Sequence, residues 1–194
     1  MRRGLRGTRL VISDADGGLK AAIRRVMGAT WQRCRVHWMW NALAYVPKGQ
    51  QSMVSASLRQ AFLQDAAEKA HQVWRAAADQ MRERRPKLGL FMDDSERDVL
   101  AYMGFPEQHR AKLHSTNPLE RLNKEVKRCA DVVGIFPSEQ SILRLIGAVL
   151  LEQNDEWQLQ HRYMQVEGMA SLVPPTIDSE ATPLPSAQIT PQAA

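Results

Sequence analysis

The stretch His114-Ser-Thr-Asn-Pro-Leu-Glu-Arg-Leu-Asn-Lys-Glu-Val-Lys-Arg128 combines a helix start with a carboxylate and four cations. Asn117 is a favourable N-cap and Pro118 suits the first helical position, so a helix is predicted from there to Val126 or beyond. One face of this helix is apolar and is expected to pack on the rest of the protein, through Leu119, Leu122 and Val126. The other face presents an acid among amides and ammonium groups: Asn117, Glu120, Asn123, Lys124 and Lys127. Such a face suits a phosphodiester and a metal ion.

Glu120 also has a purely structural interpretation. It follows Asn117 by three residues, which is the spacing of a capping box, and a carboxylate in a first helical turn is favoured by the helix dipole. Within this stretch alone, both interpretations of Glu120 stay open.

The composition is that of an ordinary globular protein. The 194 residues are 44% apolar and 24% charged, with a net charge of +5. The charge is uneven: residues 1–48 hold ten Lys/Arg and two Asp, a net charge of +8, whereas the remainder holds 16 basic and 19 acidic residues, a net charge of −3. A basic front with interleaved tryptophans fits a polyanion such as DNA, and a solvated basic face on a protein that binds nothing is the alternative.

Cysteine usage and hydropathy indicate where the protein works. Two cysteines exclude a disulfide framework. No apolar run follows the charged start, and the longest apolar stretch is too short to cross a membrane. We therefore expect a soluble, intracellular protein without membrane contact.

The front of the chain predicts a small sheet. Residues 9–13 are a short apolar run that ends at Asp14-Ala-Asp-Gly-Gly, followed by apolar residues at helical spacing, which indicates strand, turn and helix. Asp14 would stand at the carboxyl end of a buried strand, where open α/β sheets place their ligands. Turn chemistry is the alternative role for Asp14 and Asp16.

Residues 31–37 alternate between two faces and predict a second strand. Cys34 and His37 are spaced like half of a zinc site, but the only other candidate pair, His109 and His114, is a poor one. A packed cysteine beside a histidine that orients a neighbouring group is the favoured interpretation.

The rest of the chain is predicted to be helical. Helices are expected at residues 38–45, 51–62 and 66–84, from a cap at Ser95 to Met103, and from a cap at Ser138 as a long core helix. The charged run at residues 93–96 is interpreted as a solvated face. From Val173 onward, Pro, Ser, Thr, Ala and Gln predominate without Lys or Arg, which predicts disorder.

The segments described above, in their order along the chain, resemble the Mutator family of bacterial insertion-sequence transposases. The segments that carry the resemblance are Val11–Ile23, Arg33–Leu43, Ser115–Arg128, Val132–Pro137 and Leu151–Trp157. Together they cover roughly Leu10 to Ala170, and their combination is more specific than any single motif.

The resemblance implies an α/β fold: a truncated ribonuclease H-like catalytic domain, mostly helical, with an all-helical insertion between the second and third acidic residues. The expected parts are a partial sheet with the second catalytic Asp at 1–37, the helical insertion at 38–113, the catalytic Glu helix and core helix at 114–170, and a disordered tail at 171–194. The family's DNA-binding region and first catalytic Asp precede the matched segments, so we expect this chain to be a carboxyl-terminal part.

The resemblance also implies the site and the activity, which is Mg²⁺-dependent cleavage and strand transfer of insertion-sequence DNA. Asp14 and Glu120 would be catalytic acids and metal ligands, with Mn²⁺ able to replace Mg²⁺, and Cys34 and His37 match the family's Cys-x-x-His signature. Contacts to DNA are expected from Arg33, Arg35, Asn117, Arg121, Asn123, Lys124, Lys127 and Arg128. The expected partners are transposon and target DNA and either a second copy or full-length transposase. The resemblance also implies a location in the bacterial cytoplasm, associated with the nucleoid.

Without the first acid the isolated chain is expected to be inactive. The competing interpretation is a non-catalytic DNA-binding or oligomerising remnant that modulates full-length transposase. A metal-dependent nuclease that cuts DNA and never joins it is a third.

Overall fold

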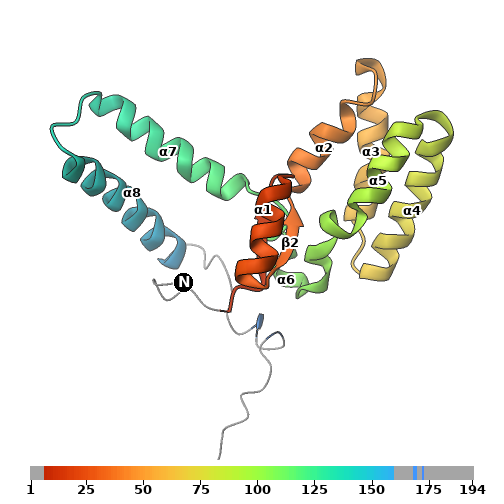
Figure 1. The fold of residues 1–194 in the computed structure, drawn as a ribbon, viewed down its shortest axis with the longest axis horizontal. Coiled ribbons are helices and arrows are strands. Elements are labelled where there is room, and N and C mark those ends of the chain that lie inside the picture. Colours follow the sequence, from red (N-terminus) through yellow and green to blue (C-terminus); the bar gives the residue numbers. More distant parts are fainter. Residues whose placement is uncertain (1–6, 160–167, 170–171, 173–194) are drawn as a thin grey trace, which may run out of the picture.

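The computed structural model describes residues 7–159, 168–169 and 172. A small strand layer lies between a block of packed helices and a helical hairpin that projects from the opposite side (Figure 1). The tail predicted at 171–194 lies outside the described residues, apart from Leu172. No helix in the described part of the chain is long and apolar enough to span a bilayer.

The strand layer is a parallel pair joined by a helix. Strand β1 (Leu10–Ser13) pairs with β2 (Thr30–Arg33), and between them α1 (Gly17–Ala22) continues into the π-helical turn η1 (Ile23–Met27). Asp16 caps α1 by accepting the Leu19 N–H at 2.6 Å, so the turn interpretation holds for Asp16. The predicted first strand and the helix after it are confirmed.

The second predicted strand is wrong beyond Arg33. Helix α2 (Arg35–Leu43) begins where the strand was expected to continue, so residues 35–37 are helical. The alternation of residues 31–37 fits a strand, but Trp38 and Ala42, four residues apart, are both fully buried on one face of α2. Burial of that helical face outweighs the local alternation.

The helical block consists of α2 and three longer helices. They are α3 (Gln51–Phe62), α4 (Ala67–Arg84) and α5 (Pro86–Val99), preceded by the 3₁₀ turn η2 (Lys48–Gln50). Trp38 and Trp74 lie in the centre of the core with their rings 4.7 Å apart. The helix predicted at 51–62 is confirmed, and that at 66–84 begins one residue later.

Helix α5 begins nine residues before the start predicted at Ser95 and ends at Val99 instead of Met103. Pro86 starts it at a favoured position, and Gly89 allows α4 and α5 to pack closely, since a Cβ there would lie 2.9 Å from the Cα of Arg82. Ser95, predicted as a cap, is buried inside α5 and accepts the Trp38 Nε1–H at 2.7 Å. The chain then passes through η3 (Ala101–Gly104) and α6 (Glu107–Arg110).

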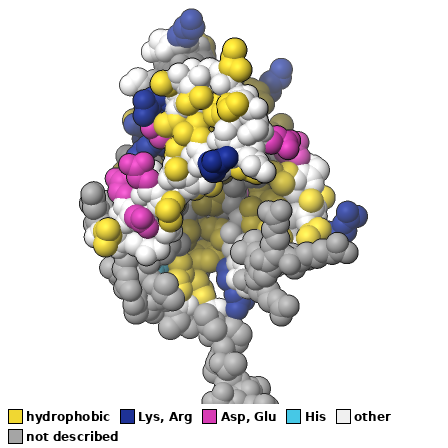
Figure 2. Space-filling model, turned by 90° about the vertical axis from the view of Figure 1, so that its left-hand side faces the viewer, with side chains coloured by type: hydrophobic (Ala, Val, Ile, Leu, Met, Phe, Trp, Pro, Cys, Tyr) yellow, Lys and Arg dark blue, Asp and Glu magenta, His cyan; other side chains and the backbone are white. Residues whose placement is uncertain are grey.

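The projecting hairpin consists of α7 (Asn117–Val133) and α8 (Glu139–Leu159), and it contains no buried residue. The prediction that both helices pack an apolar face into the core is therefore wrong: Leu119 and Leu150, which lie on the faces predicted to pack, are 57% and 44% exposed. Hydrophobic side chains are visible across this side of the molecule (Figure 2). An amphipathic pattern shows that a face needs a partner, but within the described residues the two helices cover each other only in part.

Both hairpin helices begin close to where they were predicted. The N-cap of α7 is Thr116, one residue before the predicted cap, and the Asn117–Glu120 capping box does not form. Ser138 does cap α8, since its Oγ accepts the Ser141 N–H at 3.3 Å.

Candidate active site

Asp14 and Cys34 follow the two parallel strands at the same edge of the sheet. The Cys34 N–H donates to the Ser13 carbonyl at 2.8 Å, which continues the strand pairing up to the site. The Asp14 side chain is 61% exposed, whereas Cys34 is fully buried. Because parallel strands bring their carboxyl ends together, residues twenty positions apart in sequence meet here.

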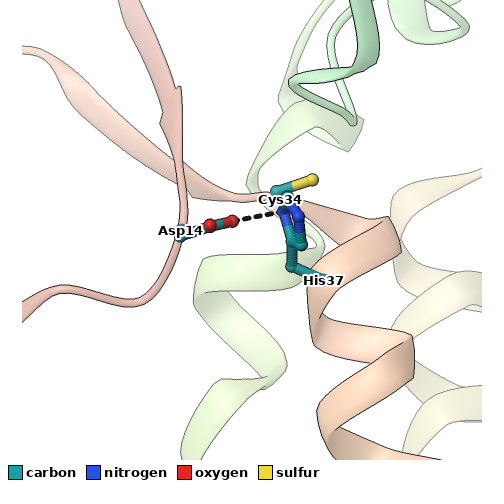
Figure 3. A group of neighbouring side chains, drawn as sticks. All are labelled: Asp14, Cys34 and His37. Atoms are coloured by element: carbon teal, nitrogen blue, oxygen red, sulfur yellow. Dashed lines mark ion pairs between the residues drawn. The ribbon is translucent and has the colours of Figure 1, made fainter. Parts of the chain in front are cut away.

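His37 lies one turn into α2, since Cys34 is the residue immediately before that helix. Its imidazole Nδ1 closely approaches the carboxylate of Asp14 and forms an ion pair when the ring is protonated (Figure 3). The Nδ1 atom is buried and makes no hydrogen bond, so the contact with Asp14 is close but not aligned as one.

Glu120 approaches the same imidazole from α7. Its Oε1 lies 3.7 Å from His37 Nε2, so Asp14 and Glu120, 106 positions apart in the sequence, contact the two different nitrogens of one ring. Glu120 is 48% exposed, and its Oε1 accepts a hydrogen bond from the Thr116 hydroxyl. The structure therefore brings the two predicted acids together around His37.

Thr116 and Cys34 join the start of α7 to the start of α2. The Thr116 N–H lies 3.5 Å and its Oγ1 3.3 Å from Cys34 Sγ, and the Arg35 N–H donates to the His114 carbonyl at 2.8 Å. Burial alone raises the pKa of the Cys34 thiol, but hydrogen bonds from the His37 backbone and from Thr116 outweigh it, so the pKa lies below its ordinary value. Sequence reasoning missed Thr116, whose only signal is its place before Asn-Pro.

Asp14, Cys34 and His37 form a group of potential metal ligands, since their ligand atoms all lie within 4.8 Å of one another. Glu120 is not part of this group, but its Oε1 approaches the other nitrogen of the His37 ring at 3.7 Å. Carboxylate oxygens suit Mg²⁺, whereas nitrogen and sulfur suit zinc. Cys34 Sγ is already engaged by Thr116. Within the described chain the second ligand pair of a structural zinc site does not assemble, because His114 Nδ1 lies instead 3.1 Å from the Arg110 carbonyl.

The predicted DNA-contacting residues fall into two groups. Arg33 and Arg35 lie over aromatic rings, at 4.9 Å from the Phe91 centroid and 4.8 Å from that of Phe62. Burial lowers the pKa of Arg33, and its Nε is buried without a hydrogen bond, so only part of this guanidinium could reach DNA. The second group lies exposed on α7: Asn117, Arg121, Asn123, Lys124, Lys127 and Arg128.

Three cations of α7 gather along a hollow of about 410 Å³ that Asp131 also lines. They are Lys124, Lys127 and Arg128. Arg128 is paired with Glu125, its Nε lying 3.0 Å from Oε2. The hollow thus offers two lysines with no carboxylate partner in the described part of the chain.

Comparison with known proteins gives a consistent result. The family described as "Transposase, Mutator family" matches residues 1–160. The transposase for insertion sequence element IS1081 of Mycobacterium tuberculosis is 43% identical over 166 residues, which are 85% of this chain and 40% of that protein. The transposase for ISRM5 of Rhizobium meliloti is 36% identical over 86% of this chain and 42% of its own length.

A third relative is the transposase for IS256 in transposon Tn4001 of Staphylococcus aureus, 38% identical over 80% of this chain and 40% of that protein. The chain thus spans about two fifths of the length of the curated relatives that it matches. The family match over residues 1–160 and the identity to these relatives show that the chain belongs to the Mutator family of transposases.

Proposed function

We propose that this chain supplies two of the three acids of a DDE-type active site, Asp14 and Glu120, for Mg²⁺-dependent cleavage and strand transfer of insertion-sequence DNA. The observation that carries the proposal is the approach of both carboxylates to one imidazole, that of His37. A capping role for Glu120 does not require this convergence. The capping box that would provide the structural explanation is not formed.

The donor groups fit a divalent cation. Asp14 and Glu120 are both partly exposed and offer the oxygen ligands that Mg²⁺ prefers, with Mn²⁺ able to take its place. His37 Nδ1 is buried without a hydrogen bond beside one of them. Bound cations would supply the charge that stabilises the attacking and leaving oxygens of an in-line displacement at phosphorus.

The protein's own residues would position both acids and the DNA. Thr116 holds Glu120 through its hydroxyl, and the contact of Thr116 with Cys34 fixes the start of α7 against α2. His37 lies between the acids, with one ring nitrogen facing each of them. The exposed cations Lys124 and Lys127 would hold phosphates along α7, in the hollow described above.

A ribonuclease H-like domain interrupted by a helical insertion is the architecture that we propose for the complete protein. The parallel β1–β2 pair and the helices between Asp14 and Glu120 are compatible with it. The first acid would come from a strand before β1, as the family resemblance implies. With only two acids, metal affinity and geometry degrade, so the isolated chain is expected to be inactive or nearly so.

The apolar side of the α7–α8 hairpin favours a second candidate function. An exposed apolar surface of this kind marks an interaction site, so the chain could join full-length transposase, or a second copy, without performing catalysis. This function requires the basic surface and the hairpin but no metal.

The decisive test compares Glu120→Gln with Glu125→Gln in a cutting and joining assay. The assay uses a complete homologous transposase, or supplies in trans the amino-terminal part with the first acid that the family resemblance implies. Both changes remove one negative charge from the same helix, and Glu125 contacts Arg128 rather than His37. We expect Glu120→Gln to abolish Mg²⁺-dependent cutting and joining and Glu125→Gln to retain both. Undiminished strand transfer by Glu120→Gln would remove Glu120 from catalysis. Cut ends that are never joined would instead indicate a nuclease.

A further inference from the structure

Trp40 is a large aromatic side chain that the core does not use. It lies on α2 three residues after His37, and it is 62% exposed, whereas Trp38 and Ala42 of the same helix are fully buried. Its ring centroid lies 5.0 Å from that of His37, with the two planes at 80°. An exposed tryptophan therefore lies directly beside the imidazole that both candidate acids approach.

A cavity of about 420 Å³ adjoins Trp40, between α2 and the end of α3. Its walls combine apolar side chains with two guanidinium groups, and the residues that matter are Arg35, Met39, Trp40, Arg59, Phe62 and Leu63. This volume lies within the range of about 300–1,000 Å³ that small-molecule sites occupy. Leu63 is itself 69% exposed, so the apolar wall is open to an incoming group.

The charge of the cavity is one-sided. In the described part of the chain neither Arg35 nor Arg59 is paired with a carboxylate, and the guanidinium of Arg35 lies over the Phe62 ring. An adjoining cavity of about 340 Å³ shares Arg35 but also contains Asp65 and Glu107. The adjoining cavity also contains Arg110, so its guanidinium and carboxylate charges balance. An anionic ligand is therefore favoured in the first cavity, at Trp40 and Arg59.

We infer that this cavity is a subsite for one unpaired nucleotide of the DNA, with the base against Trp40 and the phosphate at Arg59 and Arg35. Proteins that hold single strands combine a cationic track with an aromatic side chain on which a base stacks. A phosphate alone would not need the apolar wall, and a paired base would not present its face to Trp40. The contact of Trp40 with His37 places this nucleotide next to the bond that the proposed reaction cuts.

The inference rests on the proposed function, because it takes DNA as the ligand, but it is tested without catalysis. The intact chain is titrated with EDTA present, and binding is followed by fluorescence anisotropy. The probes are a labelled single strand of about 12 nucleotides, the same strand with abasic positions, the paired duplex, and a duplex with one unpaired base. The variants are Trp40→Ala and Arg59→Ala. The matched control is Leu90→Ala, because Leu90 is 59% exposed on α5 and lies outside the cavity.

Stacking of one base on an aromatic side chain changes affinity by roughly five- to 150-fold. We expect Trp40→Ala to weaken single-strand binding at least about five-fold and to abolish the preference for the normal over the abasic strand. Arg59→Ala should weaken binding to both strands equally, while Leu90→Ala should bind like the unchanged chain. Thermal denaturation verifies that each variant is folded, as we expect because all the substituted positions are exposed.

The two sources of an unpaired nucleotide are separated by the probes. Tighter binding of the single strand would indicate a free strand end, and tighter binding of the duplex with an unpaired base would indicate a flipped base. The inference is overturned if Trp40→Ala binds the single strand as the unchanged chain does, or if it keeps the preference against abasic strands. Failure of the catalytic proposal would show only in the cutting and joining assay of Glu120→Gln, so the two results are independent.

Discussion

Gln32 joins the strand layer to the helical block, and its replacement by Met should reveal how much that junction contributes. The side chain is fully buried. Its Nε2 donates to the carbonyl oxygens of Arg33 and Val99 at 2.7 and 2.8 Å, and its Oε1 accepts the Tyr102 N–H at 2.8 Å. Methionine is similar in length and volume, so the Gln32→Met change removes these hydrogen bonds while altering the packing little.

The expected loss follows from the groups left behind. A buried polar group deprived of its partner costs about 1–3 kcal/mol, and both Tyr102 N–H and Val99 C=O lose the partner that Gln32 supplies, so we expect a loss of about 3 kcal/mol. For a total unfolding free energy of about 5–15 kcal/mol, such a loss is large.

Urea denaturation followed by far-ultraviolet circular dichroism measures this loss as a shift of the midpoint at unchanged slope. The matched control is Gln60→Met, because Gln60 is exposed and its amide reaches only the Ala56 carbonyl at 3.5 Å. The control should change the unfolding free energy by no more than about 0.5 kcal/mol. A loss for Gln32→Met no larger than that of the control would refute the reasoning.

Three further changes test other contacts. Burial, and then the charge of Arg35, lower the pKa of His114 in the folded protein. The unfolded chain therefore takes up a proton first, at the ordinary histidine pKa of about 6.5, so the free energy of unfolding should decrease as the pH falls below that value. Thermal denaturation should show this loss, and His114→Asn should reduce it. Thr116→Val, which removes the hydroxyl that holds Glu120, should weaken Mn²⁺ binding several-fold in calorimetry, while Thr116→Ser retains the affinity. Replacing the exposed Leu143 and Leu151 by Lys should reduce self-association in analytical ultracentrifugation, and unchanged association would exclude the hairpin as the contact surface.

Local patterns predicted those elements whose partners are close in sequence. The helix at 51–62 and the first strand could be found because their apolar spacing and their end signals agree. The full extent of helix α5 could not be predicted, since the charged run at residues 93–96 is typical of a solvated face. In the structure Glu96 is only 13% exposed in its side chain and pairs with Arg75 and His71 of α4, a tertiary contact that no local pattern shows.

The candidate site was predicted as a set of residues but not as an arrangement. Asp14, Cys34, His37 and Glu120 could be named from their motifs and from the family resemblance. Placing His37 between the two acids requires α2 to start at Arg35, which the alternation of residues 31–37 concealed. Trp40 went unnoticed because its exposure depends on which face of α2 the core buries.

The central claim is that Asp14 and Glu120 share one divalent cation at His37. It is tested most directly by titrating the chain with Mn²⁺ and following the line widths of the imidazole resonances by nuclear magnetic resonance. Paramagnetic broadening should affect the His37 ring first and should disappear in both Asp14→Asn and Glu120→Gln. His71, which pairs with Glu96 away from the site, should stay sharp and so controls for nonspecific binding to carboxylates. Equal broadening of His37 and His71, or broadening of His37 that survives both substitutions, would contradict the account.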